Sequence, residues 1–205
     1  MQKHFIFDLG NVLVDFDVND VLASIMESAG VSSLPETIRL QDTAKVVEVE
    51  TGKISDEDYL ADICLATGFN LTMEDLIKAW RKAFRLNTSG IKLFRELKTH
   101  GYPVHILSNL AWHNMEAVRQ NWPDFFDHAH ENFFSYELGL HKPDVRIYRE
   151  VLHRLEVDPH DCFFMDDKAE NIAGAQAVGM NACVFSSGNL GEIRESVSEF
   201  SGLLR

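Results

Sequence analysis

Five short apolar runs are spread along the chain, each only three or four residues long. They are His4–Phe7, Val104–Leu107, Asn132–Phe134, Cys162–Met165 and Ala182–Phe185. Short, nearly continuous runs are typical of parallel strands that are covered on both faces. Amphipathic helical patterns separate most of them, and two of these patterns end at a glycine, Gly101 or Gly179, shortly before the next run. This alternation predicts a doubly wound, Rossmann-like α/β core with a parallel sheet.

The starts of two helices can be assigned from polar residues. An apolar face that begins at Ile91 indicates one helix, which we expect Thr88 or Ser89 to cap. A second apolar face begins at Ile147, and we expect Asp144 to start that helix. Both helices are predicted to cover the sheet.

The interval between the first and second predicted strands is too long for a single crossover, since a βαβ unit takes about 30 residues. It contains helical patterns but no convincing strand. The patterns cover Val21–Ser28, Glu36–Glu50, Asp56–Leu65 and Met73–Phe84. The sequence therefore predicts a core of residues 1–14 and 88–205, with a small helical insertion of residues 15–87 after the first strand.

Polar side chains follow several of the predicted strands directly. They are Asp8 after the first strand, Ser108 and Asn109 after the second, Asp166 and Asp167 after the fourth, and Lys142 in a loop. In open α/β sheets, ligands bind beyond the carboxyl ends of the strands. Each of these residues taken singly is an ordinary turn former, helix cap or surface charge. Their joint order along one sheet edge predicts a site.

The formal net charge of −13 bears on the partners of this site. Such a chain repels nucleic acid and anionic membranes unless it carries a basic patch, and no cluster of Lys and Arg is evident. An anionic substrate would need a bound cation to approach, and the carboxylates named above could hold one. We expect no nucleic acid, membrane or protein partner.

Composition favours a globular cytoplasmic protein. Hydrophobic residues make up 45% of the 205 residues, which is enough for one sizeable core. The first apolar run meets Asp8 at once, so no signal peptide is predicted. No segment approaches the roughly 18 uninterrupted apolar residues that a membrane span needs. The three cysteines, Cys64, Cys162 and Cys183, show no ligand spacing and are expected to be reduced.

The ordered set of motifs resembles the haloacid dehalogenase superfamily over nearly the whole chain. The matching stretches are Phe-Asp-Leu-Gly-Asn-Val at 7–12, Leu-Ser-Asn at 107–109, Gly-Leu-His-Lys-Pro at 139–143 and Asp-Asp-Lys-Ala-Glu-Asn-Ile at 166–172. They are most similar to the branch of bacterial α-D-glucose-1-phosphate phosphatases, which is related to the N-terminal phosphatase domain of mammalian epoxide hydrolase. The helical insertion resembles the small α-helical cap of that family.

This resemblance implies roles for the residues at the sheet edge. Asp8 would be the nucleophile that forms an aspartyl-phosphate, and Lys142 would balance the charge of phosphate and nucleophile. Ser108 and the backbone N–H of Asn109 would hold phosphoryl oxygens. Mg²⁺ is the implied cofactor; its implied ligands are Asp8, the carbonyl of Gly10, Asp167 and, directly or indirectly, Asp166. Asn171 would orient Asp166 or Asp167.

The chain departs from the family pattern at Gly10. An Asp usually stands two residues after the nucleophile, where it protonates the leaving oxygen and later activates water. General acid–base catalysis is typically worth about 10²–10⁴-fold, so glycine there implies a slow enzyme or a substrate with a good leaving group. Asp15, Asp17 and His113 are candidate replacements. Trp112, His113 and His141 flank the motifs, but packing or a rim position is the simpler interpretation of each.

Three functions are therefore in competition. The first is a magnesium-dependent phosphatase acting on a small phosphorylated metabolite, such as the sugar phosphate α-D-glucose 1-phosphate. A second is a catalytically weak protein that binds a phosphometabolite, which the missing acid–base residue at Gly10 motivates. Third comes a haloacid dehalogenase, but that reaction needs no magnesium and would leave Asp166 and Asp167 without a purpose.

Overall fold

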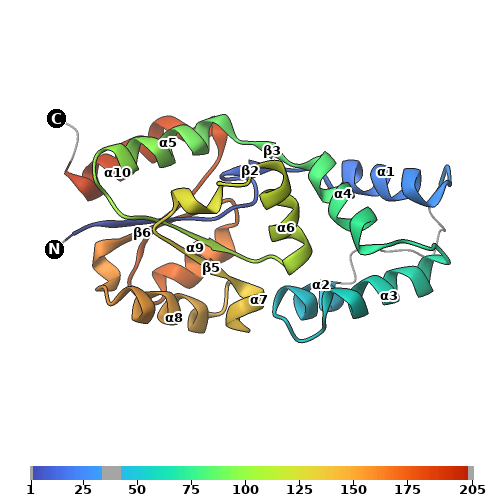
Figure 1. The fold of residues 1–205 in the computed structure, drawn as a ribbon. Coiled ribbons are helices and arrows are strands. Elements are labelled where there is room, and N and C mark those ends of the chain that lie inside the picture. The colour runs from blue at the N-terminus through green and yellow to red at the C-terminus, as the bar shows by residue number, and fades with distance from the viewer. Residues whose placement is uncertain (1, 34–42, 203–205) are drawn as a thin grey trace.

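Five parallel strands form the central sheet of the computed structural model, which describes residues 2–33 and 43–202 (Figure 1). In sheet order they are β5 (Glu131–Phe134), β4 (Val104–Ser108), β1 (His4–Phe7), β6 (Cys162–Asp166) and β7 (Asn181–Val184). All neighbouring strands run parallel, and β1 lies at the centre. The predicted sheet is confirmed, and its strand ends differ by at most one residue from those expected.

Helices cover both faces of this sheet (Figure 1). On one face lie α5 (Thr88–Thr99) and α10 (Leu190–Ser201), and on the other α8 (Val145–Leu155) and α9 (Ala169–Gln176). Side chains alternate along β1, so that Phe5 and Phe7 belong to the hydrophobic cluster under α5 and α10, whereas Ile6 belongs to the cluster under α8 and α9. The core is therefore doubly wound, as predicted.

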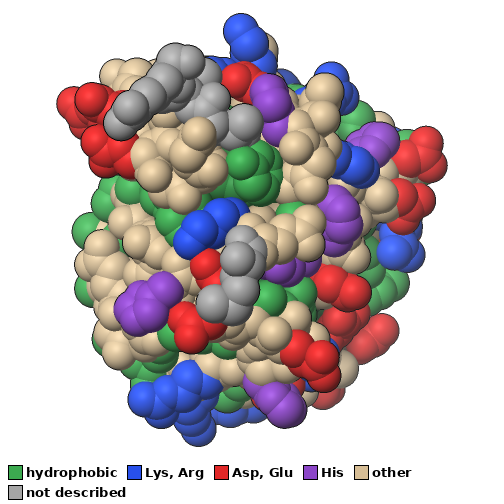
Figure 2. Space-filling view, turned by 90° about the vertical axis from the view of Figure 1, so that its left-hand side faces the viewer, with side chains coloured by type: hydrophobic (Ala, Val, Ile, Leu, Met, Phe, Trp, Pro, Cys, Tyr) green, Lys and Arg blue, Asp and Glu red, His purple; other side chains and the backbone are tan. Residues whose placement is uncertain are grey.

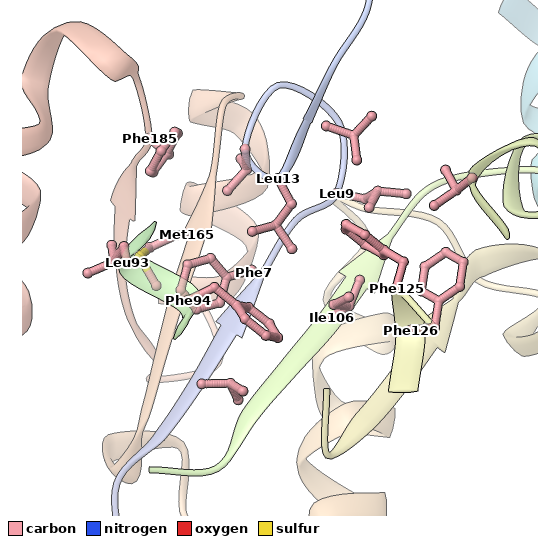
Figure 3. Packing of buried hydrophobic residues seen from close by; sticks show 14 of the residues in the cluster. Phe7, Leu9, Leu13, Leu93, Phe94, Ile106, Phe125, Phe126, Met165 and Phe185 are labelled. Carbon is pink, nitrogen blue, oxygen red and sulfur yellow. The ribbon is translucent and has the colours of Figure 1, made fainter. Parts of the chain in front are cut away.

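The packing of Phe7 fixes the position of the next residue along the chain. Its ring is fully buried and meets Phe94 of α5 edge-on, with ring centroids 5.3 Å apart. Figure 3 shows Phe7 beside Phe94 and among Met165, Leu13 and the other side chains of this cluster. A strand end held this tightly gives residue 8 little freedom, which suits a catalytic position.

The start of α5 differs from the prediction. Asn87 caps the helix rather than Thr88 or Ser89: its Oδ1 accepts a hydrogen bond from the Gly90 N–H at 2.9 Å. An amide can accept and donate at once, and Nδ2 of Asn87 also donates to Asp15 at 2.8 Å. The hydroxyl residues that follow lie within the helix. The other expected cap is confirmed, because Asp144 accepts from the N–H of Arg146 at 2.9 Å at the start of α8.

The insertion between β1 and β4 is helical and lies beyond one end of the sheet (Figure 1). Its helices are α1 (Val18–Ala29), α2 (Thr43–Glu50), α3 (Asp56–Thr67) and α4 (Met73–Ala83). Residues 36–42 of the helical pattern expected over Glu36–Glu50 lie outside the described residues. Buried side chains from α1, α3 and α4 form a hydrophobic cluster of their own. The insertion therefore has a core separate from the two that flank the sheet.

A short ribbon connects the insertion to the core. β2 (Val14–Asp15) pairs antiparallel with β3 (Arg85–Leu86), although no strand was expected between residues 15 and 87. Strands of two residues are too short to show a period in the sequence. The ribbon lies where the predicted boundaries fall, and those boundaries stay a prediction.

The remaining elements fill the space around the sheet. They are α6 (Trp112–Asn121), α7 (Ser135–Leu138) and the 3₁₀ turns Phe126–His128, Pro159–Asp161 and Ser187–Asn189. Figure 2 views the end of the molecule away from the insertion, where acidic, basic and histidine side chains are interspersed. None of the described helices is long and apolar enough to cross a membrane.

The three cysteines are free thiols.

We predict that Gly90→Ala strongly destabilises the protein. A Cβ at this position would lie 1.7 Å from the carbonyl oxygen of Val12, so the backbone of α5 or of residues 9–14 must move. Overpacking of this kind costs about 3 kcal/mol. Gly191→Ala in α10 is the matched control, because its Cβ would meet nothing within 4 Å. Thermal melts should show a lower midpoint only for Gly90→Ala, and equal midpoints for the two variants would contradict the prediction.

Candidate active site

Asp8 stands at the carboxyl end of the central strand, between β4 and β6. Its N–H donates to the carbonyl of Met165 at 2.8 Å, which fixes the backbone. Oδ1 of Asp8 accepts from the N–H of Leu9 at 2.7 Å and contacts Nζ of Lys142 at 2.8 Å. Within the described part of the chain no hydrogen bond reaches Oδ2. One oxygen of this carboxylate is therefore held and the other is free to react.

Lys142 joins three neighbouring strands at this edge of the sheet. Its side chain is 1% exposed, and Nζ contacts Asp8 at 2.8 Å and Asp166 at 2.6 Å. Nζ also donates to the carbonyl of Leu107 in β4 at 2.9 Å. A buried ammonium in contact with two carboxylates and a carbonyl has its positive charge well compensated.

The two aspartates after β6 have different surroundings. Asp166 is fully buried, and both of its oxygens accept hydrogen bonds, from Lys142, the N–H of Lys168 and the side-chain amide of Asn171. Asp167 is partly exposed and accepts one hydrogen bond, from Nδ2 of Asn11 at 2.9 Å. Asn171 thus orients Asp166 rather than Asp167. Asp166 has a structural role in this arrangement, and Asp167 keeps an oxygen for a ligand.

Three carboxylates meet here closely enough to hold one metal ion. Asp8, Asp166 and Asp167 each offer an oxygen, and these atoms lie within 4.8 Å of one another. Hard oxygen donors suit Mg²⁺, which binds few protein carboxylates and keeps its other positions for water or phosphate. Lys142 compensates only one of the three negative charges, so a divalent cation fits the charge of the cluster. Gly10 lines the same cavity.

Ser108 and Asn109, which are predicted to contact phosphate, also line this cavity. Ser108 is 3% exposed at the end of β4 and lines the cavity, and no side chain in the described ranges hydrogen-bonds its hydroxyl. The side-chain amide of Asn109 donates to the carbonyl of Lys142 at 2.9 Å and accepts from its N–H at 2.9 Å. The Asn109 side chain therefore holds the loop, and its backbone N–H stays the predicted phosphate donor.

Burial and the charges inside the cluster shift the pKa values of its members. Burial raises the pKa of Asp8 to about 7, with Asp166 adding to the effect and Lys142 opposing it. Burial alone would lower the pKa of Lys142, but Asp8 and Asp166 outweigh it and the pKa is raised. Burial alone would raise the pKa of Asp166, but the contact with Lys142 outweighs it and the pKa is lowered. Asp8 is therefore the member of the cluster that gains a proton near neutral pH.

The cavity brings the predicted residues together with some that were not predicted. It encloses about 130 Å³ and is lined by Asp8, Gly10, Asn11, Phe16, Glu50, Ser108, Asn109, His141, Lys142, Asp167, Lys168 and Asn171. Glu50 is the last residue of α2, and Phe16 also belongs to the insertion. Neither follows a core strand, so sequence reasoning had no signal for them. His141 was assigned to packing or a rim position, although it faces this cavity.

None of the three suggested proton donors lines this cavity. Asp15 pairs with Asn87 at the base of the insertion. Asp17 caps α1 by accepting from the N–H of Asn19 at 2.8 Å. His113 is buried, stacks on Tyr59 and hydrogen-bonds to Asp56. These contacts are structural, and all three residues lie outside the cavity.

A known family matches most of the chain. Residues 2–179 match the profile of haloacid dehalogenase-like hydrolases. The chain belongs to this family. The resemblance seen in the sequence is therefore confirmed at the level of the superfamily, and the protein is a hydrolase by family.

Individual relatives cover almost the same length. The sesquiterpene phosphatase astK of Aspergillus oryzae is 29% identical over 190 residues, which are 87% of this chain and 87% of that protein. D-ribitol-5-phosphate phosphatase of Bacteroides thetaiotaomicron is 26% identical over 188 residues, 87% of this chain and 89% of the relative. The solved structures include a haloacid dehalogenase family enzyme from Bacteroides thetaiotaomicron in complex with magnesium and inorganic phosphate. It superposes on this chain with a TM-score of 0.76 at 22% identity, and the match covers 92% of this chain and 96% of that enzyme. This similarity confirms the fold.

We predict that magnesium affinity falls when the pH is lowered through about 7, because Asp8 then gains a proton and becomes a poor ligand. Each further unit of acidity should weaken binding by about tenfold, since one proton competes with the metal. Titration calorimetry with magnesium measures this affinity from about pH 6 to about pH 8, roughly one unit on each side of the pKa of Asp8. Asp8→Asn should bind more weakly but show little change over this range. Equal pH dependence in both proteins would contradict the role of Asp8.

Proposed function

We propose that this hydrolase is a magnesium-dependent phosphatase that cleaves a small phosphate monoester through an aspartyl-phosphate on Asp8. The observation that carries the proposal is the state of the Asp8 carboxylate. Lys142 and the N–H of Leu9 hold Oδ1, no hydrogen bond from the described residues reaches Oδ2, and Asp167 offers an oxygen to the same cluster. A carboxylate with one oxygen fixed by hydrogen bonds and the other unbonded, next to a proposed cation site, suits nucleophilic attack on phosphorus.

The surrounding residues then have clear tasks. Oδ2 of Asp8 attacks phosphorus, and the bond from phosphorus to the ester oxygen breaks. Ser108 and the N–H of Asn109 hold phosphoryl oxygens, while Lys142 offsets the negative charge on Asp8. Held by Asp8, Asp167 and the carbonyl of Gly10, magnesium would neutralise the charge of the bound phosphate. Water then releases phosphate from Asp8.

The relatives support the reaction more closely than the substrate. Two of them are named as phosphatases, and the structural neighbour was solved with magnesium and inorganic phosphate. Their named substrates differ greatly, one being a sesquiterpene and the other a pentitol phosphate. The lining of the cavity distinguishes between these two kinds of substrate, because Phe16 is the one hydrophobic side chain among the described residues that line it. A polar lining favours a hydroxyl-rich substrate, so we propose a sugar phosphate such as α-D-glucose 1-phosphate.

The competing functions are weaker on the same evidence. A dehalogenase has no use for Asp167 beside a nucleophile that is already paired with Lys142. A protein that only binds phosphometabolites has no need for a free nucleophilic oxygen on Asp8. Both alternatives predict no phosphate release, which separates them from the proposal.

We predict that phosphate release disappears in a chelator and in Asp8→Asn, because the first removes the cation and the second the nucleophile. Asp167→Asn should retain activity but need at least tenfold more magnesium for half-maximal rate, since one charged ligand is lost. Phosphate release from a panel of sugar phosphates, followed with and without a chelator, is the measurement. Full activity of Asp8→Asn would rule out the mechanism.

We predict that hexose 1-phosphates and pentitol phosphates are hydrolysed with higher kcat/KM than phosphopeptides or a sesquiterpenyl phosphate. The cavity of about 130 Å³ is small and polar, and two residues of the insertion close it. Competition assays with mixed substrates measure the ratio directly. A phosphopeptide that outcompetes every sugar phosphate would contradict both the size and the polarity argument.

A further inference from the structure

The proposed phosphatase reaction leaves one requirement unmet, which is the transfer of a proton. The leaving oxygen needs a proton in the first step, and the attacking water must lose one in the second. Gly10 has no side chain for this, and Asp15, Asp17 and His113 lie outside the cavity. The missing group has to come from another residue that faces the bound phosphate.

Six of the described side chains that line the cavity can ionise, and four of them have other tasks or unsuitable chemistry. Asp8 is the nucleophile, Asp167 a proposed metal ligand and Lys142 the buried cation. Lys168 is an ammonium, which has no lone pair with which to accept a proton from water. Glu50 and His141 are left, and they touch each other.

These two side chains form a carboxylate–imidazole pair between the insertion and the core. Nε2 of His141 lies 2.8 Å from Oε2 of Glu50, and the side chains are 25% and 21% exposed. Nδ1 of His141 lies 3.0 Å from Nδ2 of Asn109. Because Oδ1 of Asn109 accepts from the N–H of Lys142, its Nδ2 must be the donor to His141. The imidazole therefore carries its proton on Nε2 and donates it to Glu50.

We propose that Glu50 is the general acid and base that replaces the family aspartate, with His141 as its positioning residue. The inference rests on the proposed phosphatase function. In the first step Asp8 forms its bond to phosphorus, the ester bond breaks, and the leaving oxygen takes a proton from Oε1 of Glu50. In the second step water attacks the same phosphorus, the bond to Asp8 breaks, and Oε1 takes a proton from the water. Glu50 ends the cycle as it began.

The position of Glu50 has a direct consequence for catalysis. It is the last residue of α2, so its carboxylate reaches the site only while the insertion covers the core. Its contact with His141 is one of several across this junction, since Asp56 bonds His113 and Arg81 bonds Gln120 at 3.0 Å. The proposed proton donor thus comes from the insertion, whereas the nucleophile comes from the core.

The decisive experiment follows Glu50→Gln with p-nitrophenyl phosphate in saturating magnesium. The nitrophenolate leaves without a proton, so formation of the aspartyl-phosphate should stay fast, whereas its hydrolysis should slow by about 10²-fold. Stopped-flow traces should show a burst of nitrophenolate equal to the enzyme concentration, followed by a slow phase. Asp8→Asn is the control and should show no burst. With a sugar phosphate, both steps need Glu50, and turnover should fall without a burst of the alcohol.

His141 is tested by its two substitutions. His141→Gln keeps an N–H that can reach Glu50, whereas His141→Ala removes it. A positioning role predicts about a tenfold lower hydrolysis rate for His141→Ala, with recovery of most of that loss in His141→Gln. Equal rates for both variants and wild type would overturn this part of the proposal.

Other roles for Glu50 give different results. If Glu50 were a metal ligand, Glu50→Gln would need more magnesium and would recover full turnover at high magnesium. If Glu50 only bound substrate hydroxyls, Glu50→Gln would change KM for sugar phosphates alone. Either result, or unchanged turnover of p-nitrophenyl phosphate, overturns the inference and leaves the phosphatase proposal intact. A wild-type protein without magnesium-dependent phosphate release would overturn both.

Rescue from position 10 gives an independent test. Gly10 does not adopt a left-handed φ, and a Cβ there would lie 3.2 Å from Cε1 of Phe16, so a small shift of the ring admits a side chain. Gly10→Asp should restore at least tenfold turnover to Glu50→Gln, while Gly10→Asn, of similar size, should restore none. Thermal melts identify the folded double variants. Equal turnover rates for Gly10→Asp and Gly10→Asn in the Glu50→Gln background would overturn the proton-transfer role of Glu50.

Discussion

The buried contact of Lys142 with Asp8 and Asp166 is the interaction on which the site depends. Burying three charges costs several kcal/mol per ion before their attraction is counted, so such a cluster is retained for geometry more than for stability. Here it ties the ends of β1, β4 and β6 to one nitrogen atom. The neighbouring amides of Asn109 and Asn171 then hold the lysine loop and Asp166 in place. Asp8 is positioned by this arrangement rather than by any single contact.

The same contact explains how a chain of net charge −13 can accept an anion. The buried ammonium of Lys142 lies 2.8 Å from Asp8 and lines the cavity, and the second positive charge would come from the proposed metal. Exposed charges further from the cavity than the Debye length, which is about 8 Å at physiological ionic strength, are screened by salt. Charge is therefore matched locally, and the overall field has little influence on the bound phosphate.

Sequence patterns predicted the sheet and most of the site because both depend on local signals. Short apolar runs gave the five strands, and the residues directly after them gave Asp8, Ser108 and the aspartate pair. Glu50 could not be found this way, because its place in the cavity depends on how α2 packs over the core. His141 was set aside for a related reason: its function follows from two partners distant in sequence, Asn109 and Glu50. The cap at Asn87 was missed because Thr88 and Ser89 directly after it are also common capping residues, and the sequence does not show which of the three precedes the first helical turn.

The central place of β1 in the sheet has a consequence for the order of folding. Phe5 pairs with Val104 on one side and with Phe163 on the other, so β1 has both of its partners only after the chain has been made as far as β6. Contacts of such long sequence separation are slow to form, whereas the helical insertion has a local core and can fold earlier. Asp8 therefore gains its contact with Lys142 only after the chain up to that lysine has been made.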